Sequence, residues 1–207
     1  MSRSNLHTSF IIFLSSLTLG CAQAMIIIYD FPTEFPTSEV YKVRIDDQAV
    51  DAYHTPKGSF LSFGMTSPAE VTVVYQKAPK EVVIRPLSAG ITATLDGNTC
   101  TIKLPKPMNL VAEADGDLSH PLFVFANPEL TDIPSQSDPK VKYFEAGKIH
   151  EVGEIILKDD ETLYIEGGAV VRGVVCARNA RNVAVRGAGI LDASTRKHKI
   201  NMLVFRE

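Results

Sequence analysis

The sequence predicts an all-β protein with an antiparallel β-sandwich over residues 25–126, a linker over 127–140 and the start of a parallel β-helix over 141–207. Three observations predict this fold class. Short runs rich in Val, Ile, Thr and aromatic residues alternate with turn residues. No apolar period of 3.6 residues continues long enough for a helix. The last third of the chain repeats itself at intervals of about 20 residues.

The first 24 residues have the features of a secretory signal peptide. Arg3 precedes an apolar run from Phe10 to Leu19, and Ala22-Gln23-Ala24 forms a small-x-small cleavage pattern. The run is too short to span a bilayer. The stretch "TLGC" leaves an alternative, in which Cys21 is lipidated as in bacterial lipoproteins. The segment therefore predicts a secreted or periplasmic bacterial protein, or one that is lipid-anchored at the outer membrane.

Composition excludes several classes of partner. The formal net charge of −3 is mild, which argues against a nucleic-acid partner and against a polybasic membrane patch. No other apolar stretch approaches about 20 residues, so no transmembrane segment is expected. The two remaining cysteines, Cys100 and Cys176, lie in apolar strand contexts and are interpreted as buried thiols.

The N-terminal region contains regularly spaced strand candidates. The clearest hairpin covers residues 91–104, where apolar and Thr residues alternate on both sides of an Asp-Gly turn. Strands at such spacing are typical of an antiparallel sandwich. The expected strands cover 41–45, 59–64, 70–75, 81–85, 91–95, 99–104, 109–113 and 122–126.

A proline-rich stretch, "NPELTDIPSQSDPK" (127–140), separates this region from the repeat and is interpreted as a linker or crossover. Beyond it, a shift of 20 residues superimposes the chain on itself. Units of this length that contain only short strands and glycines indicate about three stacked coils of a parallel β-helix. Glycines are expected at corners. The matched sets are Gly147/Gly167/Gly187, Gly153/Gly173, Tyr143/Leu163/Val183/Leu203, Ile165/Val185/Phe205, Ile155/Val175, Ile156/Cys176, Val170/Ile190 and Val171/Leu191.

Two further expectations depend on this repeat. Cys176 is expected in an inward stack with Ile156. Leu203 and Phe205 re-enter the apolar stack close to Glu207, with no polar capping segment after them. Because a solenoid needs a cap over its last apolar layer, the chain is expected to be the N-terminal piece of a longer protein.

These residues resemble the opening coils of the polygalacturonase-like enzymes of glycoside hydrolase family 28, and are similar to the related dextranase and isopullulanase family 49. The matching stretches are "YF-x-x-G" (143–147), "LYIEGGAVVRG" (163–173) and "NVAVRGAGILDAS" (182–194), with "HPLFVFANP" (120–128) similar to the segment that joins a sandwich to the helix. The resemblance covers roughly residues 40–207. It implies a right-handed β-helix and inverting hydrolysis of a polysaccharide, either acidic pectin or an α-glucan.

The aspartate, Gly-His-Gly and Arg-x-Lys motifs that carry catalysis in the family have no match in this chain, so no catalytic residue is assigned and the chain alone is expected to be inactive. Asp192, in "GAGILDAS", matches a recurrent family motif near the groove and is the candidate substrate contact. Asp159-Asp160 is the one acidic pair inside the repeat, and turn preference favours a solvated corner over a catalytic role.

The sequence implies no cofactor and no metal site, because the histidines are scattered without metal-ligand spacing. Two non-enzymatic alternatives stay open. A carbohydrate-binding module could use Tyr53, Phe60 or Phe63 as an aromatic platform, although Trp is absent. A surface β-helix adhesin would need no sugar chemistry.

Overall fold

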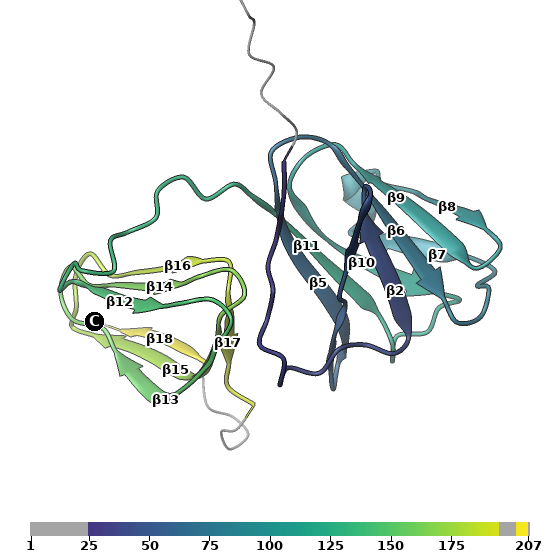
Figure 1. Ribbon diagram of the computed structural model, residues 1–207. Helices are drawn as coiled ribbons and strands as arrows, with labels where there is room; N and C mark the ends of the chain where they lie inside the picture. The colour runs from purple at the N-terminus through teal and green to yellow at the C-terminus, as the bar shows by residue number, and fades with distance from the viewer. Residues whose placement is uncertain (1–24, 195–201, 207) are drawn as a thin grey trace, which may run out of the picture.

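The computed structural model describes residues 25–194 and 202–206; the expected signal peptide and Cys21 lie outside them. These residues form strands and one short 3-10 helix, η1 (Leu87–Ala89). The strands make four open sheets of six, five, four and three strands. Figure 1 shows them as two parts, which we call the first part (25–128) and the second part (141–194 with 202–206). The all-β prediction is confirmed. Within the described ranges, no helix has the length and apolar character needed to cross a membrane.

The first part contains the six-stranded and five-stranded sheets. The six-stranded sheet has the order β1-β5-β11-β10-β7, with β4 beside β5, and the five-stranded sheet has the order β3-β2-β6-β9-β8. The six-stranded set is β1 (Ile26–Ile28), β4 (Tyr53–Thr55), β5 (Gly58–Met65), β7 (Val82–Arg85), β10 (Met108–Ala114) and β11 (Leu122–Pro128). The five-stranded set is β2 (Tyr41–Ile45), β3 (Gln48–Val50), β6 (Ala69–Tyr75), β8 (Ala93–Asp96) and β9 (Thr99–Leu104).

One hydrophobic core holds these two sheets together. Burial alternates strictly along β6, so Val71 and Val73 face inward while their neighbours do not. On the opposite sheet, Leu122 and Val124 of β11 face the same core. Alternation of this kind places one apolar face of each sheet against the other and leaves a second face for other contacts.

The sequence prediction of strands was accurate where alternation was long enough to see. All eight expected strands exist, with ends within two residues of those expected. The predicted hairpin is confirmed, with Asp96 paired to Thr99. Strands β1, β3 and β4 were missed because three residues are too few to show a period. The expected start of the linker was early, since Asn127 and Pro128 still pair with Gly64 and Met65 of β5.

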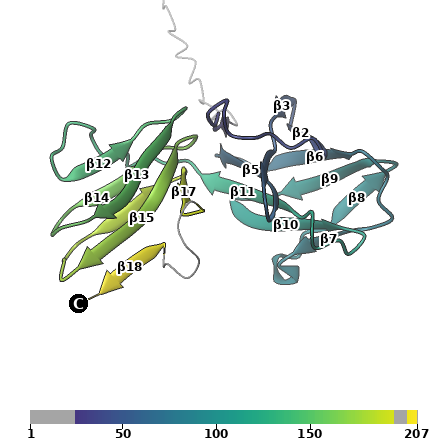
Figure 2. The same cartoon turned by 90° about the horizontal axis from the view of Figure 1, so that it is seen from below.

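The second face of the six-stranded sheet is also covered. β5 is buried along almost its whole length, because Leu61 and Phe63 face the core while Phe60 faces the second part. β11 runs parallel to β5 and also carries alternating side chains, with Phe123 and Phe125 on this outer face. Figure 2 shows the two parts side by side, with β17 (Ile190–Asp192) on the side of the second part that faces the first.

The second part consists of two parallel sheets. The three-stranded sheet has the order β12-β14-β16, and the other has the order β13-β15-β17 with β18 also beside β15. All of these pairs are parallel. The strands are β12 (Val141–Phe144), β13 (Ile149–Ile156), β14 (Thr162–Ile165), β15 (Val170–Arg178), β16 (Ala184–Gly187), β17 (Ile190–Asp192) and β18 (Leu203–Arg206).

The predicted 20-residue register holds along part of one sheet and fails in the other. Gly153 pairs with Gly173, Ile155 with Val175, and Val170 with Ile190, as expected. In the three-stranded sheet, however, Tyr143 pairs with Tyr164 rather than Leu163, and Gly187 pairs with Ile165 rather than Gly167. The difference arises because the corners between strands vary in length, and a fixed shift cannot absorb extra corner residues.

Two more expectations from the repeat are corrected. Leu203 pairs with Val175, not with Val183, because β18 adds to β15. Cys176 does pair with Ile156, but neither belongs to the inner cluster of the second part, and the Ile156 side chain is 59% exposed. The inward positions are the neighbours Ile155, Val175 and Ala177. A shift by one residue reverses the face of a strand residue.

Recurring glycines in the second part allow neighbouring strands to approach closely. A Cβ on Gly187, whose φ is +114°, would lie 1.9 Å from the carbonyl oxygen of Ile165. A Cβ on Gly173 would lie 2.6 Å from the carbonyl oxygen of Gly153. At Gly187, glycine is needed both for the left-handed backbone and for the close approach of the neighbouring strand. At Gly173, it is needed only for the close approach. The corner interpretation therefore holds for Gly187, which ends β16, and is wrong for Gly173, which lies within β15.

Candidate functional site

The two parts meet at a cluster of aromatic side chains that we call the aromatic junction, formed by Tyr29, Phe31, Tyr53 and Phe60 against Val170 of β15. Phe31 makes edge-to-face contacts with Tyr53 and Phe60 at centroid distances of 4.9 and 5.7 Å. The backbone N–H of Phe31 donates to the Tyr53 hydroxyl at 3.2 Å. Such geometry favours aromatic pairs beyond simple burial, so the segment after β1 packs tightly between the two parts.

Beside the aromatic junction lies a groove of about 910 Å³. Its size is in the range of ligand sites, roughly 300–1,000 Å³. One wall is the outer face of the six-stranded sheet together with β4 and the turn after it. The other wall is formed by Arg172 of β15 and by residues 187–194 around β17.

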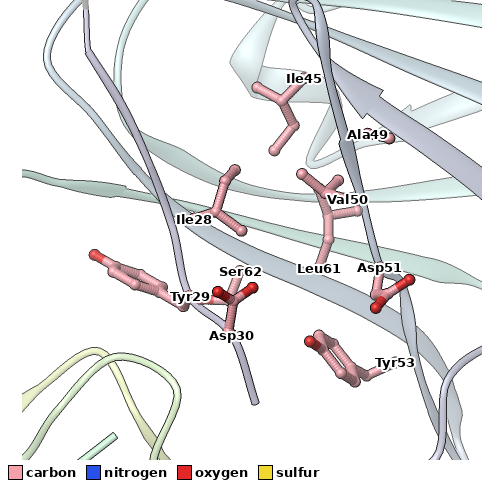
Figure 3. A pocket seen from close by; sticks show the side chains of 10 residues that line it. All are labelled: Ile28, Tyr29, Asp30, Ile45, Ala49, Val50, Asp51, Tyr53, Leu61 and Ser62. Atoms are coloured by element: carbon pink, nitrogen blue, oxygen red, sulfur yellow. The ribbon is translucent and has the colours of Figure 1, made fainter. Parts of the chain in front are cut away.

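A second pocket is much smaller, at about 170 Å³. Figure 3 shows Asp30, Asp51 and Tyr53 toward one end of the side chains that line it and Ile45 toward the other end. This volume falls below the range of ligand sites, and in the described ranges no three His, Cys, Asp or Glu side chains come together to hold a metal. The groove is therefore the better candidate site.

On the first wall, three side chains form a row across adjacent strands. Phe125 of β11 is paired with Asn109 of β10 and with Ser62 of β5. Partners directly opposite each other lie on one face, with Cβ atoms about 5 Å apart. Phe125 is 37% exposed and stacks on Phe123, with an interplanar angle of 6°. The row thus presents an aromatic face between a hydroxyl and an amide.

On the second wall, Arg172 lies between two carboxylates. Its Nη1 donates to Glu151 at 2.7 Å, and its Nε lies 3.4 Å from Asp192 Oδ2. Asp192 pairs with Arg172 in the β-ladder, and its Oδ1 accepts a hydrogen bond from the Ser194 N–H at 2.8 Å. Because Arg172 carries one positive charge beside two carboxylates, it is fully paired, and the three side chains together keep one excess negative charge.

The sequence-predicted contact residue, Asp192, thus lines the groove, while Arg172 and Phe125 were missed. A signal for Arg172 existed, since it lies one repeat before Asp192. Phe125 could not be distinguished from an ordinary strand aromatic, because its exposure depends on which part covers the sheet.

The expected aromatic platform on the first part is wrong in its residues. Phe63 is fully buried in the core, and Tyr53 and Phe60 are 7% and 6% exposed at the aromatic junction. Phe60 reaches the floor of the groove, but Tyr53 and Phe63 do not line it. The exposed aromatic residue on this wall is Phe125 instead.

The acidic pair Asp159-Asp160 is a corner, as turn preference predicted. Asp160 has a left-handed backbone, with φ of +60°, and its carboxylate accepts a hydrogen bond from Asn182 at 3.0 Å. Asp159 accepts from the Arg181 N–H. Hydrogen bonding to Asn182 and the charge of Lys140 lower the pKa of Asp160. Both acids therefore stabilise stacked corners and do not face the groove.

A Ser, a His and an Asp also meet at an exposed turn of the first part, without forming a catalytic triad. Nδ1 of His120 lies 2.9 Å from both Ser119 Oγ and Asp117 Oδ2. A triad needs the serine and the carboxylate on opposite ring nitrogens. The bonds from Ser119 and His120 instead lower the pKa of Asp117 and hold the turn.

Comparisons with known proteins agree with this architecture. No protein-family model matches the chain, and neither does any curated protein sequence. Its fold is similar to that of Dex49A from Penicillium minioluteum, a family 49 dextranase and β-helix glycoside hydrolase, with a TM-score of 0.60 and 13% identity. The similarity covers 86% of this chain and 53% of Dex49A, so the chain spans about half the length of that structure. The chain thus has a β-rich fold like that of a glycoside hydrolase.

Proposed function

We propose that the chain is the N-terminal part of a secreted polysaccharide-degrading glycoside hydrolase. The observation that carries this proposal is the similarity of 86% of the chain to about half of a dextranase structure. In this proposal the first part is a β-sandwich, and the second part forms the first coils of a right-handed parallel β-helix. The substrate is a polysaccharide, either pectin-like or an α-glucan.

The groove supports a binding role for this chain more than a catalytic one. Inverting hydrolysis uses two carboxyl groups about 6.5–9.5 Å apart, one to protonate the leaving oxygen and one to activate water. Among the described residues that line the groove, Asp192 is the acidic one, and it already forms an ion pair with Arg172. We therefore assign Asp192 to substrate contact and place the acid and base on coils beyond residue 207.

Hydrolysis assays test this proposal. The purified 207-residue chain should release no reducing ends from polygalacturonate, dextran or pullulan, because the acid–water–base arrangement is missing. A protein extended by the coding sequence after codon 207 should hydrolyse one of them. An extended protein inactive on all three, or the absence of an open frame, would refute the proposal. Activity of the 207-residue chain that Asp192→Asn abolishes would overturn the assignment of Asp192.

A further inference from the structure

We infer that the groove between the two parts binds an uncharged oligosaccharide, with Phe125 as its stacking surface and the Asn109 and Ser62 side chains beside it. This inference rests on the proposed function for the kind of ligand, but the site itself follows from the geometry of described residues.

Phe125 has the placement of a ligand-contacting aromatic residue. Burial in the core accounts for Leu122, Val124 and Ala126 of the same strand, which face inward. Phe123 packs against the aromatic junction. Phe125 is 37% exposed and lines the groove. An exposed aromatic ring supported by stacking on Phe123 offers a rigid apolar face to the C–H groups of a sugar ring.

Polar groups around Phe125 match the hydroxyls of a sugar. The exposed Asn109 amide makes no side-chain hydrogen bond with residues 25–194 or 202–206, so its donors and its acceptor can serve a ligand. Asn127 donates its amide N–H groups to Ser62 Oγ and to two backbone carbonyls, which leaves its oxygen as an acceptor. Across the groove, the Asp192 carboxylate keeps acceptor capacity beyond its bond to Ser194.

Charge selects against a uronate chain. The permanent cations in the described lining are Lys57 and Arg172, and the charge of Arg172 is compensated by Glu151 and Asp192. A uronate chain carries one carboxylate per sugar unit, and the groove offers it no net positive charge, because the single positive charge of Lys57 is offset by the excess carboxylate of the Glu151, Arg172 and Asp192 group. An uncharged chain needs only the aromatic face and the hydrogen-bonding groups, which the groove supplies.

Titration of the purified full chain with isomaltohexaose and, separately, with hexagalacturonate tests the inference. We expect isomaltohexaose to bind measurably and to shift the amide resonances of Phe125, Asn109 and residues 190–192. Phe125→Ala should weaken binding about tenfold. Asn109→Asp, an exposed change that replaces the two amide N–H donors by a carboxylate, should weaken binding of the uncharged sugar and weaken any binding of hexagalacturonate further.

Phe205→Ala is the matched control, because it removes a similarly exposed phenyl ring outside the groove lining, and it should leave the affinity unchanged. Four outcomes would overturn the inference: binding of neither sugar, tighter binding of hexagalacturonate, resonance shifts confined to other surfaces, or a concentration-dependent dimer that Phe125→Ala dissociates. The assay needs no catalysis. If the 207-residue chain binds isomaltohexaose but the extended protein hydrolyses no substrate, only the proposed function is refuted. If the extended protein hydrolyses a substrate but the 207-residue chain binds neither sugar, only this inference is refuted.

Discussion

Tyr29 lies against Gly167 so closely that a Cβ on this glycine would be 2.5 Å from Tyr29 Cδ1. The Tyr29 hydroxyl also lies near Gly64 of β5, where an added Cβ would be 2.9 Å away. One tyrosine side chain is thus held between two glycines that belong to different parts of the protein. The missing side chains at these positions let the segment after β1 join the six-stranded sheet to β15.

Gly167→Ala should therefore destabilise the full chain by about 1–3 kcal/mol, the usual cost of forcing extra atoms into a packed site. If the Tyr29 ring is the cause, the same change should cost much less in a Tyr29→Ala background. Urea unfolding of the four proteins of this double-mutant cycle measures the coupling. Purely additive effects would show that Gly167 is required for another reason.

Gly187→Ala should unfold the edge of the second part. The new Cβ would lie 1.9 Å from the Ile165 carbonyl oxygen, and the residue has a φ of +114°. Gly147→Ala is the control, because its φ of +72° carries backbone strain with nothing within 4 Å of the new Cβ; it should cost about 1 kcal/mol. Amide exchange should rise in β14 and β16 for the first variant and change little for the second. Equal effects would contradict the close-approach explanation.

Cys100 should make the folded state less stable in alkali. Burial raises the pKa of its thiol from 9.0 to about 11. Between these values the unfolded thiol has lost its proton and the folded one keeps it, so stability is complete below pH 9 and falls as pH rises towards 11. Urea midpoints measured from pH 8 to 11 should fall, and less steeply in Cys100→Ala, which removes the titrating group. An identical slope in both proteins would assign the loss to other groups, such as Tyr75, whose pKa burial also raises.

The β16 and β18 strands should be the least protected elements of the second part. Their inward-facing side chains Val185, Leu203 and Phe205 are 36%, 44% and 49% exposed, since no further strand stacks on them within the described residues. Exchange measured by mass spectrometry should be fast there and slow in β5 and β6, which are central strands. The full chain should also self-associate, and Phe205→Lys should reduce that association. Uniform protection in a monodisperse monomer would contradict both expectations.

Local pattern was enough to predict much of this fold from the sequence. Strands such as β2 and β6 were located because period-2 alternation is a property of a single strand and needs no partner to be seen. Pairs such as Gly153 with Gly173 followed from the repeat, since stacked coils place equivalent residues side by side. The two cysteines described as buried thiols, Cys100 and Cys176, are free and buried in the structure.

Tertiary structure alone decided the register of the three-stranded sheet, because the corners between its strands differ in length. It also decided that Cys176 lies on the outer face of β15, since a shift of one residue along a strand moves a side chain to the opposite face. It also decided the site. Phe125, Asn109 and Asp192 carry no shared sequence pattern, and they line one groove because the segment around Tyr29 brings the second part against the outer face of the six-stranded sheet. Contacts between distant segments depend on how whole faces pack, and an alternating pattern shows that a face exists without showing what covers it.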